Sequence, residues 1–259
     1  WIREDFRLEN NAALSYATQN HQNVIAFFIY NNSDYDNKRE AQKWWLSKSL
    51  QNFKKDLFNY QINLQIIKGD ELEIFSKIKK KDNVSIYWNK IYEPDVIAKG
   101  RKIRDIFIKN DINFKYFKGN ILNEFQEVTK NDKTPFKVFT PFWRTAEKIY
   151  LSLPPSKNYI IKKKSKIKSF FKNTITSNDI LPKKNWHKKF EKYWDVSENN
   201  SKKILRDLLE NKIKNYGTAR DIPSIEGTSK LSPYIKFGQI HVGTIWKRCN
   251  EIKSKSIGY

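Results

Sequence analysis

The sequence predicts an α/β fold, with a Rossmann-like parallel sheet in an N-terminal domain (residues 1–127), a long linker (residues 128–190) and the start of an all-helical domain (residues 191–259). Three observations predict this arrangement. Apolar runs of strand length alternate with helix-period segments in the first half, prolines interrupt the middle, and only helical periodicity follows. With 39% hydrophobic residues, the 259-residue chain has enough apolar side chains for two modest cores.

Four apolar runs mark the strands of the first domain. They span residues 24–30, 62–68, 84–88 and 112–117, and the helix-period segments between them span residues 40–60, 72–80 and 96–108. Strands and helices that alternate through short links form right-handed βαβ units, and hence a parallel sheet. No GxGxxG pattern is present, so the sequence does not predict an NAD site.

The second half changes character near residue 128. Asn131 and five prolines (Pro135, Pro141, Pro154, Pro155 and Pro182) interrupt it, and KKKSKIK at 162–168 is a charge run, as expected for a surface-crossing linker. An apolar helical face follows, formed by Ile204, Leu205, Leu208, Leu209, Ile213 and Tyr216, with Gly217 as the expected helix stop. Residues 233–249 predict one or two further helices. The pattern begins in mid-strand and ends before a helical core closes, so we expect both ends to be incomplete.

The composition is strongly basic. Fifty Lys and Arg residues against 28 Asp and Glu residues give a formal charge of +22, which favours a polyanionic partner such as nucleic acid. Nucleotide bias in an AT-rich genome also produces chains rich in Lys, Asn and Ile, so both explanations stay open. The single cysteine, Cys249, excludes an internal disulfide framework. Without a long apolar run or a signal peptide, we expect a cytoplasmic protein with no membrane partner.

Residues for the common catalytic constellations are missing. His21, His187 and His241 lie far apart and show neither HxxxH nor HxxE spacing, so no metal site is expected. No GxSxG pattern accompanies the many Ser and Thr residues. The sequence therefore predicts no side-chain apparatus for hydrolysis.

One segment does carry binding chemistry, namely YGTARDIPSIEGTSKLSPYIKFG at residues 216–238. Thr228, Ser229 and Ser232 supply hydroxyls, the region of Gly227 supplies backbone N–H groups, and Lys230 supplies a cation just before an expected helix start. Together they form a candidate cradle for a diphosphate. The alternative is that these are ordinary helix-capping residues with a Ser-Pro helix entry.

This segment also resembles the flavin-binding signature of the DNA photolyase and cryptochrome family. Further stretches fall in the family's order: WIREDFRLENNAAL at 1–14, AQKWWLSKSL at 41–50, YWNKIYEP at 87–94, FKGNILNE at 117–124, PFKVFTPFWR at 135–144 and YWDVSE at 193–198. The resemblance covers nearly the whole chain. It implies an α/β antenna domain, a connector and a helical FAD-binding domain, in agreement with the organisation inferred from periodicity.

By position, the resemblance implies FAD contacts from Tyr216, Thr228, Ser229, Lys230, Leu231 and Ser232. Tyr216 is alternatively the last apolar residue of its helix, and Leu231 a core residue. Arg220 matches an arginine that faces the DNA lesion, with a salt bridge to Asp221 or a neighbour as the alternative. Glu93 is the candidate contact for an antenna chromophore, although EPDVIAKG lacks the Asn-Glu pattern of folate-binding members. Trp44 and Trp45 either line such a pocket or belong to the core.

The resemblance implies a class I deoxyribodipyrimidine photolyase. In such an enzyme, light-driven electron transfer from reduced FAD splits cyclobutane pyrimidine dimers in UV-damaged DNA, and the cofactor carries the difficult step. A second antenna chromophore, either methenyltetrahydrofolate or a deazaflavin, is expected, as is a monomer. The catalytic residues, including the tryptophan relay, are expected outside the given chain. The alternatives are a cryptochrome-type blue-light receptor and a nonspecific nucleic-acid-binding α/β protein without flavin.

Overall fold

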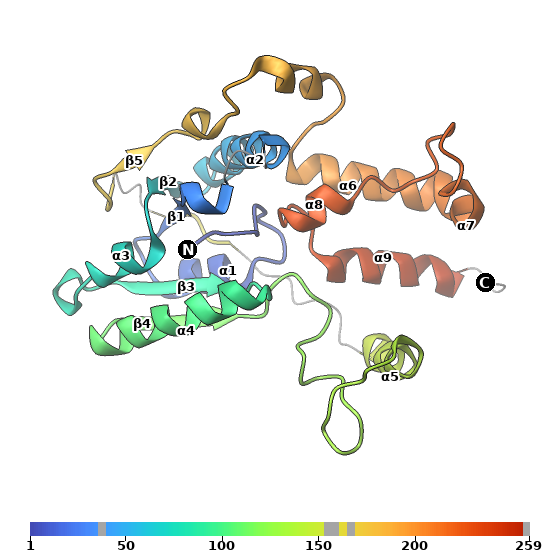
Figure 1. Ribbon diagram of the computed structural model, residues 1–259, viewed down its shortest axis with the longest axis horizontal. Helices are drawn as coiled ribbons and strands as arrows, with labels where there is room; N and C mark the ends of the chain where they lie inside the picture. Colours follow the sequence, from blue (N-terminus) through green and yellow to red (C-terminus); the bar gives the residue numbers. More distant parts are fainter. Residues whose placement is uncertain (36–39, 153–160, 165–168, 256–259) are drawn as a thin grey trace.

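The computed structural model describes residues 1–35, 40–152, 161–164 and 169–255 (Figure 1). All four expected strands are present within about one residue of their predicted bounds: β1 (Ile25–Tyr30), β2 (Asn63–Lys68), β3 (Ser85–Asn89) and β4 (Asn113–Phe117). β1 pairs with β2 and β3 pairs with β4, in both cases in parallel. The prediction of a parallel α/β domain is thus confirmed.

The N-terminal segment lies between the two strand pairs. The amide of Ile2 donates to the carbonyl of Phe27 on β1, and the backbone nitrogen of Trp1 donates to the carbonyl of Tyr87 on β3, both at 2.8 Å. On the far side of β2, the two-residue strand β5 (Thr174–Ile175) pairs antiparallel with it. The sequence did not predict β5, which adds an antiparallel edge to an otherwise parallel arrangement.

Helices cover these strands. α2 (Glu40–Phe58) and α4 (Pro94–Lys109) match their predictions, whereas α3 (Glu71–Ser76) is shorter and is followed by a 3-10 turn (Lys80–Asp82). α1 (Ala12–Asn20) was not predicted. Its start is fixed by Asn11, whose side-chain oxygen accepts a hydrogen bond from the amide of Leu14 at 3.1 Å.

The expected linker is partly helical. It contains α5 (Phe139–Ser152) and the 3-10 helices Ser177–Ile180 and Asn185–Lys192. Pro141 falls in the first turn of α5, where a missing amide proton breaks no helical hydrogen bond. Trp143 of α5 packs edge-on against Trp246, with ring centroids 5.9 Å apart, so this part of the linker joins the helical region.

The last third is helical, as predicted. It comprises α6 (Glu198–Asp207), a π-helical turn (Leu208–Lys212), a 3-10 turn (Ile213–Asn215), α7 (Tyr216–Ala219), α8 (Ser232–Lys236) and α9 (Val242–Lys255). Leu205, Leu208 and Leu209 are buried, as their spacing predicts. The predicted stop at Gly217 is wrong, because the helix continues through this residue to Ala219. Within the described ranges, no helix has the length and apolarity needed to cross a bilayer.

α2 packs against the last third of the chain through the aromatic residues near its start. Trp44 and Trp45 are both buried in the core, so their burial favours a packing role over the lining of a chromophore pocket. The Trp45 ring lies 5.0 Å from that of Tyr234, and its indole nitrogen donates to the side-chain oxygen of Gln239 at 3.0 Å. Gly238 follows in the left-handed region (φ 66°), and a Cβ there would collide with the Glu4 carbonyl. The turn after α8 is therefore seated directly on the N-terminal segment.

Candidate functional site

The predicted cradle folds as a hairpin-like excursion between α7 and α8 (Figure 1). Turns follow α7, with the amides of Asp221 and Ile222 donating to the carbonyls of Thr218 and Ala219 at 3.2 Å. Gly227 then returns to α7 so closely that a Cβ on it would collide with the Ala219 carbonyl. The Gly227 position thus serves chain packing, and it brings the second part of the signature back against the first.

The hydroxyl-bearing residues lie at the surface of this excursion. Thr228 and Ser232 are exposed and Ser229 is partly buried. Within the described part of the chain, no partner is recorded for the hydroxyls of Thr228 and Ser232, and Ser229 makes a long contact (3.4 Å) with the amide of Leu231. In the capping alternative, a hydroxyl oxygen before the helix accepts a short hydrogen bond from a backbone amide of the first helical turn. Among the described residues, the Thr228 and Ser232 hydroxyls make no such contact, whereas the Ser229 hydroxyl accepts weakly from the Leu231 amide.

Lys230 lies in the left-handed region, with φ 54°, and its ammonium group is 2.6 Å from the Glu226 carboxylate. Both side chains are exposed, so this pair holds Lys230 weakly. α8 is only five residues long, which is shorter than expected, and its dipole is correspondingly small. The cradle therefore depends on hydroxyl groups, amides and the Lys230 charge.

The other signature residues divide between core and surface. Leu231 is buried in the main hydrophobic cluster, and Tyr216 is partly buried against the same cluster. Arg220 keeps 56% of its side chain exposed, and its Nε lies 3.7 Å from the Asp221 carboxylate. That separation is an ion pair without a hydrogen bond, and exposed pairs of this kind contribute little. Arg220 is therefore accessible to a partner from solvent.

Glu93 lies at the N-cap of α4, on the wall of a cavity of about 520 Å³. Its carboxylate is 2.7 Å from the ammonium of Lys236, which also contacts Glu4 at 2.6 Å. Burial tends to lower the pKa of Lys236, but the two carboxylates outweigh it and the pKa is raised. Glu93 thus helps to join α4 to α8, which is a structural role that its position in the sequence did not reveal.

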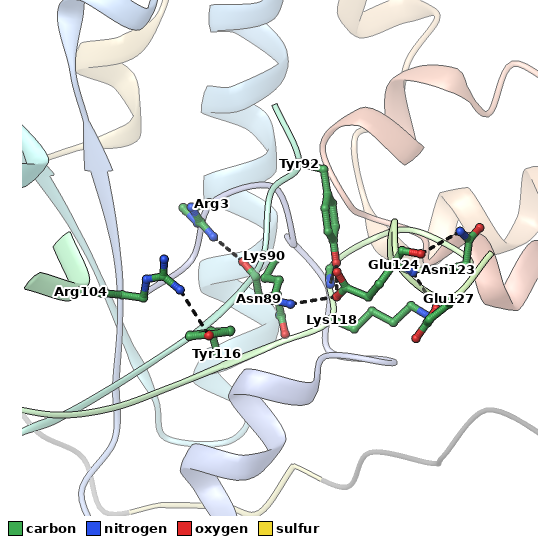
Figure 2. Close-up of polar contacts among 11 residues, drawn as sticks. Arg3, Asn89, Lys90, Tyr92, Arg104, Tyr116, Lys118, Asn123, Glu124 and Glu127 are labelled. Carbon is green, nitrogen blue, oxygen red and sulfur yellow. Dashed lines mark hydrogen bonds and ion pairs between the residues drawn. The ribbon is translucent and has the colours of Figure 1, made fainter. Parts of the chain in front are cut away.

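A buried polar network links two of the quoted motifs, and the sequence did not predict it. The side-chain amide of Asn89, at the end of β3, donates to Asp5 at 2.6 Å and to Asn11 at 2.9 Å. Arg3 donates to the Asn89 carbonyl at 2.5 Å (Figure 2). Buried Arg7 donates to the Gly238 carbonyl at 2.8 Å. The sequence signal that could have revealed this network is the presence of polar side chains within apolar stretches, because buried polar groups need hydrogen-bond partners.

A family model described as DNA photolyase matches residues 1–159, which is more than half of the chain. The chain belongs to the DNA photolyase family. The match confirms the family resemblance of five motifs, which all lie within the matched range: residues 1–14, 41–50, 87–94, 117–124 and 135–144.

Curated relatives of this photolyase-family chain are named as photo-lyases and as cryptochromes. A deoxyribodipyrimidine photo-lyase of Agrobacterium fabrum is 28% identical over 95% of the chain and 51% of the relative. Cryptochrome-1 of Arabidopsis thaliana is 23% identical over 95% of the chain and 37% of the relative. The chain spans about half the length, or less, of these relatives.

Solved structures share the fold. A bacterial class III photolyase from Agrobacterium tumefaciens superposes with a TM-score of 0.84, at 24% identity, over 100% of this chain and 54% of the other. A Synechocystis cryptochrome gives a TM-score of 0.85 at 18% identity, over 100% and 56% of the two chains. At these identities the likeness shows a common fold, and the expected class I subtype stays a prediction.

Proposed function

We propose that the protein is a flavin-dependent deoxyribodipyrimidine photo-lyase that splits cyclobutane pyrimidine dimers in UV-damaged DNA under light. The similarity to a photo-lyase over 95% of the chain carries this proposal, because it includes the signature segment beyond the matched family model. The basic composition supports it, since a charge of +22 favours binding to a polyanion.

The signature segment fits a diphosphate-containing cofactor. Thr228, Ser229 and Ser232 would hold the FAD phosphates through hydroxyls and neighbouring amides, with Lys230 supplying positive charge. Tyr216 and Leu231 would pack at the base of the site, as their partial and full burial allows. When bound, FAD would supply the light-driven electron, while these side chains bind and orient it.

Arg220 would contact the damaged strand. It is exposed, and its pairing with Asp221 is long, so a phosphate oxygen can compete for the guanidinium at little cost. Contacts of this kind position a protein on DNA without reading its sequence. Flipping a pyrimidine dimer out of the duplex costs less free energy than flipping an intact base, because the damage already disturbs its stacking.

The antenna is proposed at the cavity beside Glu93. That cavity of about 520 Å³ has a volume within the range of small-molecule sites. Methenyltetrahydrofolate and a deazaflavin both remain candidates. A monomer and a cytoplasmic location stay predictions.

A cryptochrome-type photoreceptor is the second candidate. The Arabidopsis cryptochrome similarity covers the same share of the chain as the photo-lyase similarity, so the signature alone does not favour repair over signalling.

Spectroscopy and a repair assay on the whole gene product test these proposals. A photo-lyase should show flavin absorbance and should remove cyclobutane dimers from irradiated DNA only under near-UV or blue light. Flavin absorbance without dimer loss, with the flavin fully reduced, would favour the receptor. The absence of flavin would contradict both and favour a nucleic-acid-binding protein.

The cradle has its own test in flavin occupancy. Replacing Thr228 and Ser229 together with alanine removes hydrogen bonds to a charged group, worth about 1.5–3 kcal/mol each, so occupancy should fall sharply. Thr145→Ala is the matched control, because this partly buried residue lies on α5 and its hydroxyl donates to the Pro141 carbonyl one turn earlier in the same helix. Equal flavin content in the double variant and the control would show that these hydroxyls do not bind the phosphates.

A further inference from the structure

A second cavity, of about 350 Å³, opens where β3 and β4 end, beside α4. It is bordered by Trp88, Lys90, Tyr116, Gly100, Arg101 and Arg104, and the segment at residues 124–126 closes one side. Ligands of open parallel sheets bind in crevices outside the carboxyl ends of the strands. The volume falls at the lower end of the range for small-molecule sites.

The wall of this cavity is strongly basic. Arg3, Lys90, Arg101 and Arg104 border it, against a single carboxylate, Glu124, which lies 3.1 Å from Lys90. Among the described residues, no carboxylate lies within ion-pair distance of the three guanidinium groups. The Nε of Arg3 is buried without a hydrogen-bond partner there. Burial lowers the pKa of Arg3 to about 10, which leaves it charged at neutral pH. Four basic side chains therefore border this cavity against one carboxylate, although Asp5, Glu71 and Glu4 also act on the Arg3 charge from outside the wall.

Aromatic rings lie among these cations. Arg104 donates to the Tyr116 hydroxyl at 3.3 Å, and its guanidinium lies 5.6 Å from the ring centroid (Figure 2). The Lys90 ammonium is 5.2 Å from the same ring. Phe125, 61% exposed, stands edge-on to Tyr92 on the rim. An exposed ring contributes little burial energy to the core, but its flat face is a surface on which a nucleic-acid base can stack.

Gly100 is the least expected residue of the wall. It lies in the middle of α4, where glycine is less favourable than alanine, and its φ is not left-handed. A Cβ added there would meet no atom within 4 Å. Chain packing therefore gives no reason for glycine. The missing side chain leaves room on the cavity wall, as close approach of a ligand would require.

The cavity beside Glu93 differs in charge, although the two cavities share Arg3, Ile91, Val96 and Gly100. Its wall carries three basic side chains (Arg3, Lys99 and Lys236) and four acidic ones (Glu4, Glu71, Glu93 and Asp95). A small anion would therefore favour the cavity at the ends of β3 and β4.

We propose that this cavity binds a nucleoside 5′-monophosphate. The phosphate lies on Arg101 and Arg104, whose planar forks match phosphate oxygens, and the base stacks on the rings of Tyr116 and Phe125. Gly100 provides the space that lets the ligand approach α4. The site is separate from the flavin signature, and its ligand does not depend on the proposed repair activity.

Calorimetric titration of the whole protein with adenosine 5′-monophosphate tests the site. Binding should be measurable at low salt and should weaken as KCl rises. Adenosine, which lacks the phosphate, and ribose 5-phosphate, which lacks the base, should each bind at least tenfold more weakly. Ribose 5-phosphate binding as tightly as the nucleotide would overturn the stacking, and no heat at millimolar nucleotide would overturn the site.

Two variants on α4 separate binding from folding. Arg101→Gln should weaken nucleotide binding at least tenfold, whereas Lys102→Gln, the adjacent exposed residue outside the cavity wall, should leave it unchanged. Gly100→Ala should raise the thermal midpoint by about 2 °C, because alanine favours the helix, and yet weaken binding. Unchanged binding in both Arg101→Gln and Gly100→Ala would refute the proposal.

Discussion

Replacing Glu198 with alanine should loosen the attachment of α6 to the N-terminal segment. Glu198 is 6% exposed, and its carboxylate accepts hydrogen bonds from the amides of Leu8 at 2.6 Å and Glu9 at 3.1 Å. It also lies 2.8 Å from the Lys202 ammonium. One carboxylate thus joins residues nearly 200 positions apart in the sequence.

The expected loss is about 3 kcal/mol. Hydrogen bonds to a charged group contribute about 1.5–3 kcal/mol each, and two backbone amides lose their acceptor. Lys202 keeps a partner, because Glu9 lies 2.6 Å from it, so no buried charge is left alone. An adjoining cavity of about 590 Å³ lets water reach the freed amides, which favours the lower end of the range.

Urea unfolding followed by circular dichroism measures this loss. With a slope of about 3 kcal/mol/M for a chain of this size, the midpoint should fall by about 1 M. Glu210→Ala is the control, since Glu210 is exposed shortly after α6. The substitution should also lower the pKa of Asp56, which burial and then the Glu198 charge hold above its usual value. A midpoint within 0.2 M of the control, on the order of 0.6 kcal/mol, would refute the reasoning.

Three further predictions concern the turn after α8 and the DNA contact. Gly238→Ala should cost more than about 3 kcal/mol in thermal unfolding, because the left-handed backbone and the Glu4 carbonyl both exclude a Cβ, whereas Gly217→Ala meets open space and should be neutral or stabilising. Burial lowers the pKa of His241 to about 4, so the unfolded chain binds more protons below about pH 6.5 and stability should fall by about 2 kcal/mol from pH 7 to pH 5. His241→Asn should lack that part of the pH dependence, and an unaltered pH profile would show that another group causes it. Arg220→Gln should weaken binding to dimer-containing DNA and reduce its salt slope by about one, with flavin absorbance retained. An equal effect of Arg206→Gln, at another exposed arginine, would argue against a specific contact.

Much of the fold could be predicted from local pattern. The four strands of the sheet are apolar runs, and α2 and α4 carry strong helical periodicity. α1 was missed because it is rich in Ala, Ser and Thr and depends on the Asn11 cap. α5 was missed because Pro141 looks like an interruption although it occupies a first turn. β5 has only two residues, and its pairing with β2 is a long-range contact that no local pattern encodes.

The candidate site was predictable in its residue types and less so in its geometry. Hydroxyls and a cation in one short segment indicated an anion cradle, and the structure leaves Thr228 and Ser232 exposed as such a site requires. The close contact of Gly227 with Ala219 depends on the path of the intervening loop. The Asn89 network joins residues that are 78 and 84 positions apart, so the sequence contains these residues but does not indicate that they are in contact.

The close contact between Gly238 and the N-terminal segment also affects the order in which the chain folds during synthesis. Arg7 and the Gly238 carbonyl are 231 residues apart, so the buried guanidinium cannot gain this partner until most of the chain has left the ribosome. Closing a flexible loop of that length costs about 5 kcal/mol of chain entropy. The strands can assemble earlier, because their contacts are closer in sequence. Docking of α8 should thus be a late step. Until it occurs, Trp45 and its apolar neighbours stay exposed and can be bound by a chaperone.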